Sequence, residues 1–286
     1  MSPDTAPAPR RTRRSKAVAT DASVGFRQRQ LDTSRFGIVY DVDGPRIRLG
    51  VMWFVLAGVG LFVGMVSTAV VFGLVAALAA AQTATTLRTK WCRPDRRVAA
   101  AIALAMPLSA LVGVGLTGIV VLVSAVLAVG ASAVLRAKGT DPIVDAGAVI
   151  RSSLFVGLAA ASMVLLHRID IGAAITLFLL VSAYEFGDFL VGSGASNRIE
   201  GPASGMLAAV VMTAALSAPL IEPQPFQGGT IWLFGIIAAI VCPVGQVAAS
   251  AILPRAGAPA RALRRLDSYL VAAPLWLVLM WAEVHL

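Results

Sequence analysis

Residues 49–87 read LGVMWFVLAGVGLFVGMVSTAVVFGLVAALAAAQTATTL and contain no charged side chain. As an α-helix, which rises about 1.5 Å per residue, this run would extend about 60 Å, twice the hydrocarbon thickness of a bilayer. We therefore expect a hairpin of two membrane-spanning helices, with its turn near residues 64–67. Residues 98–135 repeat the pattern, and there we expect the turn near residues 113–118. The two runs predict four transmembrane helices.

The rest of the chain is equally apolar. Hydrophobic residues make up 58% of the 286 residues and charged residues only 14%, a balance that a soluble core does not need. Five further apolar runs follow, at about 147–166, 171–191, about 205–220, 230–252 and 269 to about 281. We therefore expect an all-α, polytopic integral membrane helix bundle with about nine transmembrane spans.

Positive charge is concentrated in alternate loops. The formal net charge is +9, and nearly all loop Arg and Lys fall within 88–97, 136–151, 193–203 and 254–267, whereas Arg168 lies on the opposite side. Basic residues of membrane proteins collect in cytoplasmic loops and fix the orientation. We therefore expect a multi-pass cell-membrane protein with a cytoplasmic N-terminus. The charge does not indicate a nucleic-acid partner.

Residues 1–48 form a region separate from the apolar domain at 49–286. They are rich in Ala, Pro and Arg and include the basic run RRTRRSK at 10–16. Such a segment buries little apolar surface, so we expect a partly disordered cytoplasmic tail. Its charge has two interpretations. One is a topogenic signal that keeps the N-terminus inside, which we favour, and the other is a polybasic contact with anionic lipid headgroups.

Acidic residues interrupt the apolar pattern at one end of the expected bundle. Glu185 and Asp188 are three residues apart, so on a helix they share one face, about a turn from the cytoplasmic end. Asn197 and Glu200 follow in the next loop, and Asp267 begins the last run on the same side of the membrane. Ionisable groups at membrane depth cost about 2.5 kcal/mol or more each and mark functional cavities. We therefore expect a functional site here.

Acidic side chains and an amide at the cytoplasmic end of the bundle suit Mg²⁺, which is coordinated by one or two carboxylates together with substrate phosphates and water. Nearby arginines are suited to binding phosphate, and they are Arg198, Arg255, Arg261, Arg264 and Arg265. A simpler interpretation pairs Asp267 with Arg264 or Arg265, and Glu200 with Arg198, as interfacial ion pairs. We favour that interpretation for Asp267 and Glu200 taken alone, and a functional role for Glu185, which lies deepest.

Four short segments in the last third of the chain resemble a known family of membrane enzymes. The first two are EFGDFLVG at 185–192 and EGPASG at 200–205. The other two are GQVAAS at 245–250 and RLDSYLVAAP at 265–274. They resemble the signature elements of the phosphatidate cytidylyltransferases, the CDP-diacylglycerol synthases, which also have about nine spans and basic cytoplasmic loops.

The resemblance implies an enzyme that transfers a nucleotidyl group from CTP to phosphatidate at the cytoplasmic face, with Mg²⁺ holding the phosphates. It implies catalytic roles for Glu185, Asp188 and Asp267, with Glu185 and Asp267 as metal ligands. It implies substrate-binding roles for Asn197, Arg198, Glu200, Gly201, Ser250, Arg264 and Arg265. The expected partners are a membrane lipid such as phosphatidic acid, CTP, and a second copy of the chain in a homodimer.

The chain also departs from the family's pattern. Gln246 and Arg264 stand where the family has Asp, and Glu185 replaces an Asp. No Lys follows Ser250, and the family's His-Gly-Gly element is missing. Two alternatives therefore stay open. One is a catalytically silent relative that binds a lipid or a partner protein, and the other is a small transporter that uses Glu185 and Asp188 as a proton or cation site.

Overall fold

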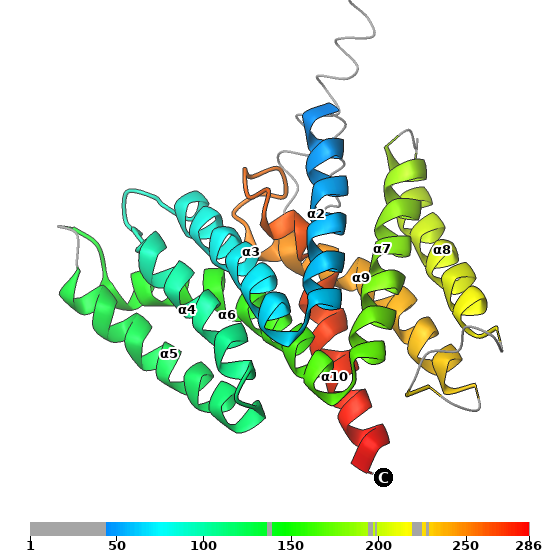
Figure 1. Ribbon diagram of the computed structural model, residues 1–286. Helices are drawn as coiled ribbons and strands as arrows, with labels where there is room; N and C mark the ends of the chain where they lie inside the picture. The colour runs from blue at the N-terminus through cyan, green and yellow to red at the C-terminus, as the bar shows by residue number, and fades with distance from the viewer. Residues whose placement is uncertain are drawn as a thin grey trace, which may run out of the picture.

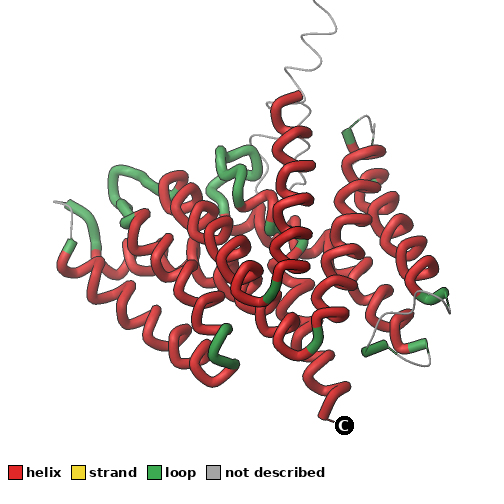
Figure 2. Tube along the Cα trace, viewed as in Figure 1, coloured by secondary structure: helices red, strands yellow, loops and turns green. Residues whose placement is uncertain are grey.

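The computed structural model describes residues 44–135, 139–193, 197, 199–218, 225–226 and 229–285. Within these residues the chain has nine α-helices, one short 3-10 helix and no strand (Figure 2). The all-α prediction is therefore confirmed for this part of the chain. The basic run at 10–16 lies outside the described residues, so the expectations for the tail stay predictions.

The helices follow the predicted runs. They are α2 (Gly44–Val63), α3 (Met65–Thr86), α4 (Arg96–Ala110), α5 (Val114–Val134), α6 (Pro142–Ile169), α7 (Ile171–Gly192), α8 (Glu200–Leu216), α9 (Thr230–Ile252), η1 (Leu263–Arg265) and α10 (Tyr269–His285). Gly64, with φ +139°, separates α2 from α3, and Gly113, with φ +150°, precedes α5. Residues other than glycine rarely adopt such φ values. Both hairpins therefore turn where the sequence predicts.

Five of the described helices are long and apolar enough to cross a membrane, namely α3, α5, α6, α7 and α9. Three apolar helical segments are shorter, at 50–63, 200–216 and 269–284, and α4 has 15 residues. A helix of about 20 apolar residues matches the hydrocarbon thickness. By length and composition, these helices indicate a multi-pass membrane protein.

Helix α6 lies at the centre of the bundle. It contacts α3, α4, α5, α7 and α10 (Figure 1). In its most apolar stretch 72% of the residues are buried, against 17% in α5. Ala159, Ala160 and Ala161 of α6 are buried, and small residues of this kind let helix backbones approach closely. Helix α5 turns most of its apolar side chains outwards, as a lipid-facing helix does.

Two glycines allow close packing around the polar end of α7 and α9. At Gly187 of α7, an added Cβ would lie 2.7 Å from the Ala208 Cβ of α8. At Gly245 of α9, an added Cβ would overlap the backbone oxygen of Asp267. Glycine at these two positions therefore allows α8 to pack closely on α7, and the segment before α10 to pack closely on α9.

Several connections with basic residues share one end of the bundle, whereas Arg168 lies at the other end, where its Nη1 donates to the Leu111 backbone oxygen at 2.8 Å. Figure 1 shows the connections at 87–95 and 253–268, the start of α2 and the end of α7 at its upper end. The turn at 111–113, the start of α7 and the C-terminus lie at the lower end. The helices thus alternate in direction in the way that the charge pattern predicts.

Candidate functional site

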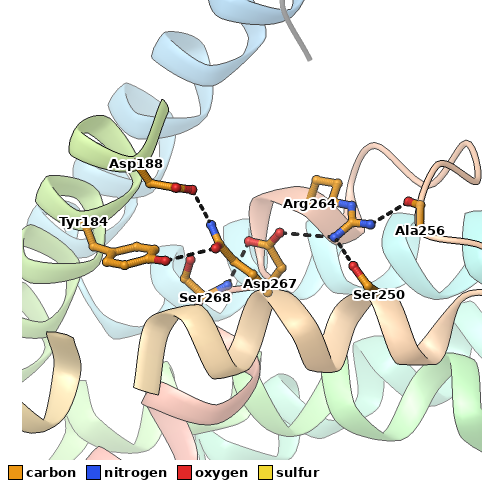
Figure 3. A network of polar contacts seen from close by, with 8 residues as sticks. Tyr184, Asp188, Ser250, Ala256, Arg264, Asp267 and Ser268 are labelled. Atoms are coloured by element: carbon orange, nitrogen blue, oxygen red, sulfur yellow. Dashed lines mark hydrogen bonds and ion pairs between the residues drawn. The ribbon is translucent and has the colours of Figure 1, made fainter. Parts of the chain in front are cut away.

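A polar network joins α7 and α9 inside the bundle (Figure 3). The Tyr184 hydroxyl donates a hydrogen bond to Gln246 Oε1 at 3.0 Å. Gln246 Nε2 in turn donates to Asp188 Oδ2 at 2.9 Å. All three side chains are buried. Because Tyr184 and Asp188 are four residues apart on one face of α7, a single amide from α9 reaches both.

Arg264, in η1, forms the second part of the network (Figure 3). Its Nη1 donates to Ser250 Oγ at 3.1 Å, and its Nη2 donates to the Ala256 backbone oxygen at 2.7 Å. Nη1 also lies 3.7 Å from Asp267 Oδ2. Asp267 Oδ1 accepts a hydrogen bond from the Ser268 backbone N–H at 2.8 Å. The guanidinium therefore ties the C-terminal end of α9 to η1 and holds Asp267 in place.

The ion pair expected between Asp267 and Arg264 is thus present, but it is not an exposed interfacial pair. Asp267 is only 6% exposed and lies between η1 and α10. Burial raises the pKa of the Asp267 carboxyl above its usual range, while the neighbouring Arg264 acts in the opposite direction. The pair is therefore an interior feature, where charge interactions are stronger than in water.

Glu185 differs from its neighbours in the network. Its side chain is half-buried overall, and its Oε1 is buried without a hydrogen bond of ordinary geometry among the described residues, although the Ser268 side chain is near enough to act on the carboxyl group. A buried polar atom left unpaired costs about 1–3 kcal/mol, and more when it is charged. The buried Oε1 of Glu185 is therefore able to accept a hydrogen bond or to contact a cation.

Six of the sequence-predicted site residues gather in this region, and they are Glu185, Asp188, Ser250, Arg264, Arg265 and Asp267. Arg265 follows Arg264 in η1, two residues before Asp267. Its guanidinium also lies beside α2, since an added Cβ at Gly50 would be 3.1 Å from Arg265 Nη1. The start of α2 therefore covers one side of the site.

The residues of the α7–α8 connection are placed differently. Asn197 and Glu200 are exposed, and Asn197 Oδ1 accepts a hydrogen bond from the Ile199 backbone N–H at 3.4 Å. Gly201 is buried in the first turn of α8. Arg198 lies outside the described residues, so its pairing with Glu200 stays a prediction.

Sequence reasoning did not assign Tyr184 and Gln246 to the site. The available signal was Gln246 itself, because it is an amide inside the otherwise apolar run 230–252. A buried amide needs hydrogen-bond partners. Its partners lie on α7, which is distant in sequence, and only the packing of α7 against α9 identifies them.

The carboxylates fit Mg²⁺ in one specific way. In the part of the chain that the structure describes, no three His, Cys, Asp or Glu side chains are grouped so as to hold a metal ion. Mg²⁺ binds to proteins through as few as one or two carboxylates, with substrate phosphates and water completing its shell. Glu185, through its unpaired Oε1, and Asp267 are the carboxylates suited to this. Glu185 and Asp267 therefore stay candidates for an ion that substrate phosphates would also have to bind.

Comparisons with known protein families, with curated proteins and with solved structures find no match to this chain. Its function is therefore inferred from its own site and from the short motifs around that site.

Proposed function

We propose that this chain is a cytidylyltransferase-like integral membrane protein that transfers a nucleotidyl group from CTP to a lipid phosphate. Phosphatidate is the expected acceptor and CDP-diacylglycerol the expected product. All nine described helices lie within the bilayer, and the N-terminus and the site face the cytoplasm, as the distribution of basic residues favours. CTP reaches the site from the cytoplasm, and the lipid reaches it from the bilayer.

One observation carries this proposal. Asp188 of α7 is hydrogen-bonded by Gln246 of α9, and Asp267 pairs with Arg264, so carboxylates from two distant parts of the sequence lie in one buried polar network inside an apolar bundle (Figure 3). Ionisable groups are rare inside membrane proteins and are usually functional. The mixture of carboxylates and guanidinium groups suits a ligand that brings both phosphates and a divalent cation.

The proposed reaction exchanges one phosphoanhydride bond for another. An oxygen of the lipid phosphate attacks the α-phosphorus of CTP, the bond from that phosphorus to the β-phosphate oxygen breaks, and pyrophosphate leaves. Glu185 and Asp267 would hold Mg²⁺, which would supply neutralisation of the phosphate charge during the displacement. Arg265 supplies a cationic contact for phosphate. Arg264 keeps Asp267 in position, and Gln246 does the same for Asp188.

A turnover assay tests the proposal. Purified protein in mixed micelles with phosphatidic acid, Mg²⁺ and labelled CTP should form labelled liponucleotide, and removal of Mg²⁺ with EDTA should stop product formation. A folded preparation that forms no product and binds no CTP would contradict the proposal.

A second candidate is a catalytically silent relative that binds a lipid or a partner protein. It is favoured because side chains that could bind a substrate already form hydrogen bonds or ion pairs with other residues of the protein. Arg264 is engaged by Ser250, Ala256 and Asp267, and Asp188 is held by Gln246. Calorimetric titration of CTP with Mg²⁺ into protein in nanodiscs separates the two functions, because the silent relative should give no heat of nucleotide binding.

A further inference from the structure

The connection between α3 and α4 contains several basic side chains close to an exposed tryptophan. We call residues 88–97 the basic turn. Its exposed basic side chains are Arg88, Lys90, Arg93, Arg96 and Arg97. Trp91 is 69% exposed among them, and the Lys90 ammonium lies 5.3 Å from the centroid of the Trp91 ring. This distance is within the range of a cation–π interaction.

The backbone of the basic turn is fixed by hydrogen bonds. The Thr89 N–H donates to the Cys92 backbone oxygen at 2.7 Å, and Thr89 Oγ1 accepts from the Cys92 N–H at 3.1 Å. The Arg93 N–H donates to Oδ1 of buried Asp145, in α6, at 2.6 Å. The basic side chains and Trp91 are therefore presented from a defined backbone that is anchored on the central helix.

The charge of the basic turn is not neutralised within the turn. Asp95 is its one acid. That carboxylate caps α4, where Oδ1 accepts hydrogen bonds from the backbone N–H groups of Arg97 at 2.7 Å and Val98 at 3.2 Å. Five basic residues against one acid leave a formal charge of +4 on a short segment. Such a surface attracts anions over about a Debye length, roughly 8–10 Å at physiological salt.

We propose that the basic turn binds the headgroups of anionic phospholipids in the leaflet that it faces. It directly follows α3, a helix of membrane-spanning length. The turn therefore lies just outside the hydrocarbon region, at the level of the lipid headgroups. Indole rings concentrate at that level, and clustered Lys and Arg near the membrane surface attract anionic lipids. The basic turn shares no residue with the acidic site, so this proposal does not depend on the proposed function.

Quenching of Trp91 fluorescence by brominated lipids tests the proposal on the full chain in nanodiscs. Two sets of nanodiscs contain equal parts of phosphatidylglycerol and phosphatidylcholine, and one of the two lipids carries bromine on its acyl chains. The Trp91 signal is the difference between the wild type and Trp91→Phe. We expect quenching at least about twofold stronger when phosphatidylglycerol carries the bromine, because nearby basic residues enrich anionic lipid. High salt should remove the preference.

Two double variants localise the effect. Lys90→Gln with Arg93→Gln should abolish the preference for brominated phosphatidylglycerol. Arg255→Gln with Arg261→Gln removes two exposed charges from another connection and should leave the preference intact. The proposal is overturned by equal quenching from both sets of nanodiscs, or by a preference that survives in the Lys90 and Arg93 variant. It is also overturned if inorganic phosphate at constant ionic strength removes the preference, since the turn would then bind soluble phosphate.

Discussion

Asp145 and Glu185 are both acids in an apolar bundle, yet their surroundings differ. Asp145 accepts hydrogen bonds on both oxygens, from the Arg93 N–H at 2.6 Å and from Thr140 Oγ1 at 2.8 Å. Glu185 has a buried Oε1 that no described residue bonds. A buried charge is tolerated when it is hydrogen-bonded and is costly when it is not. The comparison separates an acid whose two oxygens are hydrogen-bonded within the fold from one that has an oxygen left to bond.

The comparison predicts that replacing Asp145 mainly affects stability. Asp145→Ala should lower the unfolding free energy by about 3 kcal/mol, because it removes two hydrogen bonds to a charged acceptor and leaves a buried N–H unpaired. Denaturant titration in mixed micelles measures this change, and Asp145→Asn should cost less because it keeps an acceptor oxygen. Turnover per folded molecule should be unchanged. A folded but inactive Asp145→Ala protein would show that Asp145 belongs to the site.

Gln246 allows a test of activity rather than of stability, because its amide donates a hydrogen bond to Asp188 of the proposed site. Gln246→Leu should lower nucleotidyl transfer by about tenfold, equivalent to about 1.4 kcal/mol, because Asp188 loses a hydrogen bond. Tyr184→Phe removes only the neighbouring hydroxyl and should have a smaller effect on the rate. Initial rates at saturating CTP measure both variants. Unchanged rates in Gln246→Leu would remove Asp188 from the proposed chemistry.

Gly245 tests the packing that brings Asp267 to the site. Gly245→Ala places a Cβ against the Asp267 backbone oxygen and should lower the unfolding free energy by about 1–2 kcal/mol. Gly118→Ala, at a helical position in α5 with open space around it, should be neutral or stabilising by about 0.5–1 kcal/mol. Thermal unfolding in detergent compares the two. Equal melting temperatures for the two variants would mean that the segment before α10 is not closely packed against α9 at Gly245.

The helices were predictable from sequence because the physics of a membrane segment is local. Charge-free runs define the spans, and Gly64 and Gly113 mark turns within them. The pairing of Arg264 with Asp267 was also predictable, since the two residues are only three apart in the sequence. The contact of Gln246 with Tyr184 and Asp188 was not predictable, because it depends on how α9 is rotated against α7. Proximity in sequence likewise suggested a site role for Asn197, but its described hydrogen bond is a local one within the loop.

The most direct test of the account is the effect of Glu185→Gln on turnover of labelled CTP with phosphatidic acid and Mg²⁺. Glu283→Gln, which changes an exposed acid of α10, is the matched control. We expect Glu185→Gln to lower turnover by at least about 100-fold, because the loss of a metal-binding carboxylate removes charge stabilisation in the transition state. Its stability should be unchanged or higher, since a neutral amide replaces a buried charge. Full turnover in Glu185→Gln would contradict the assignment of this acid to the site.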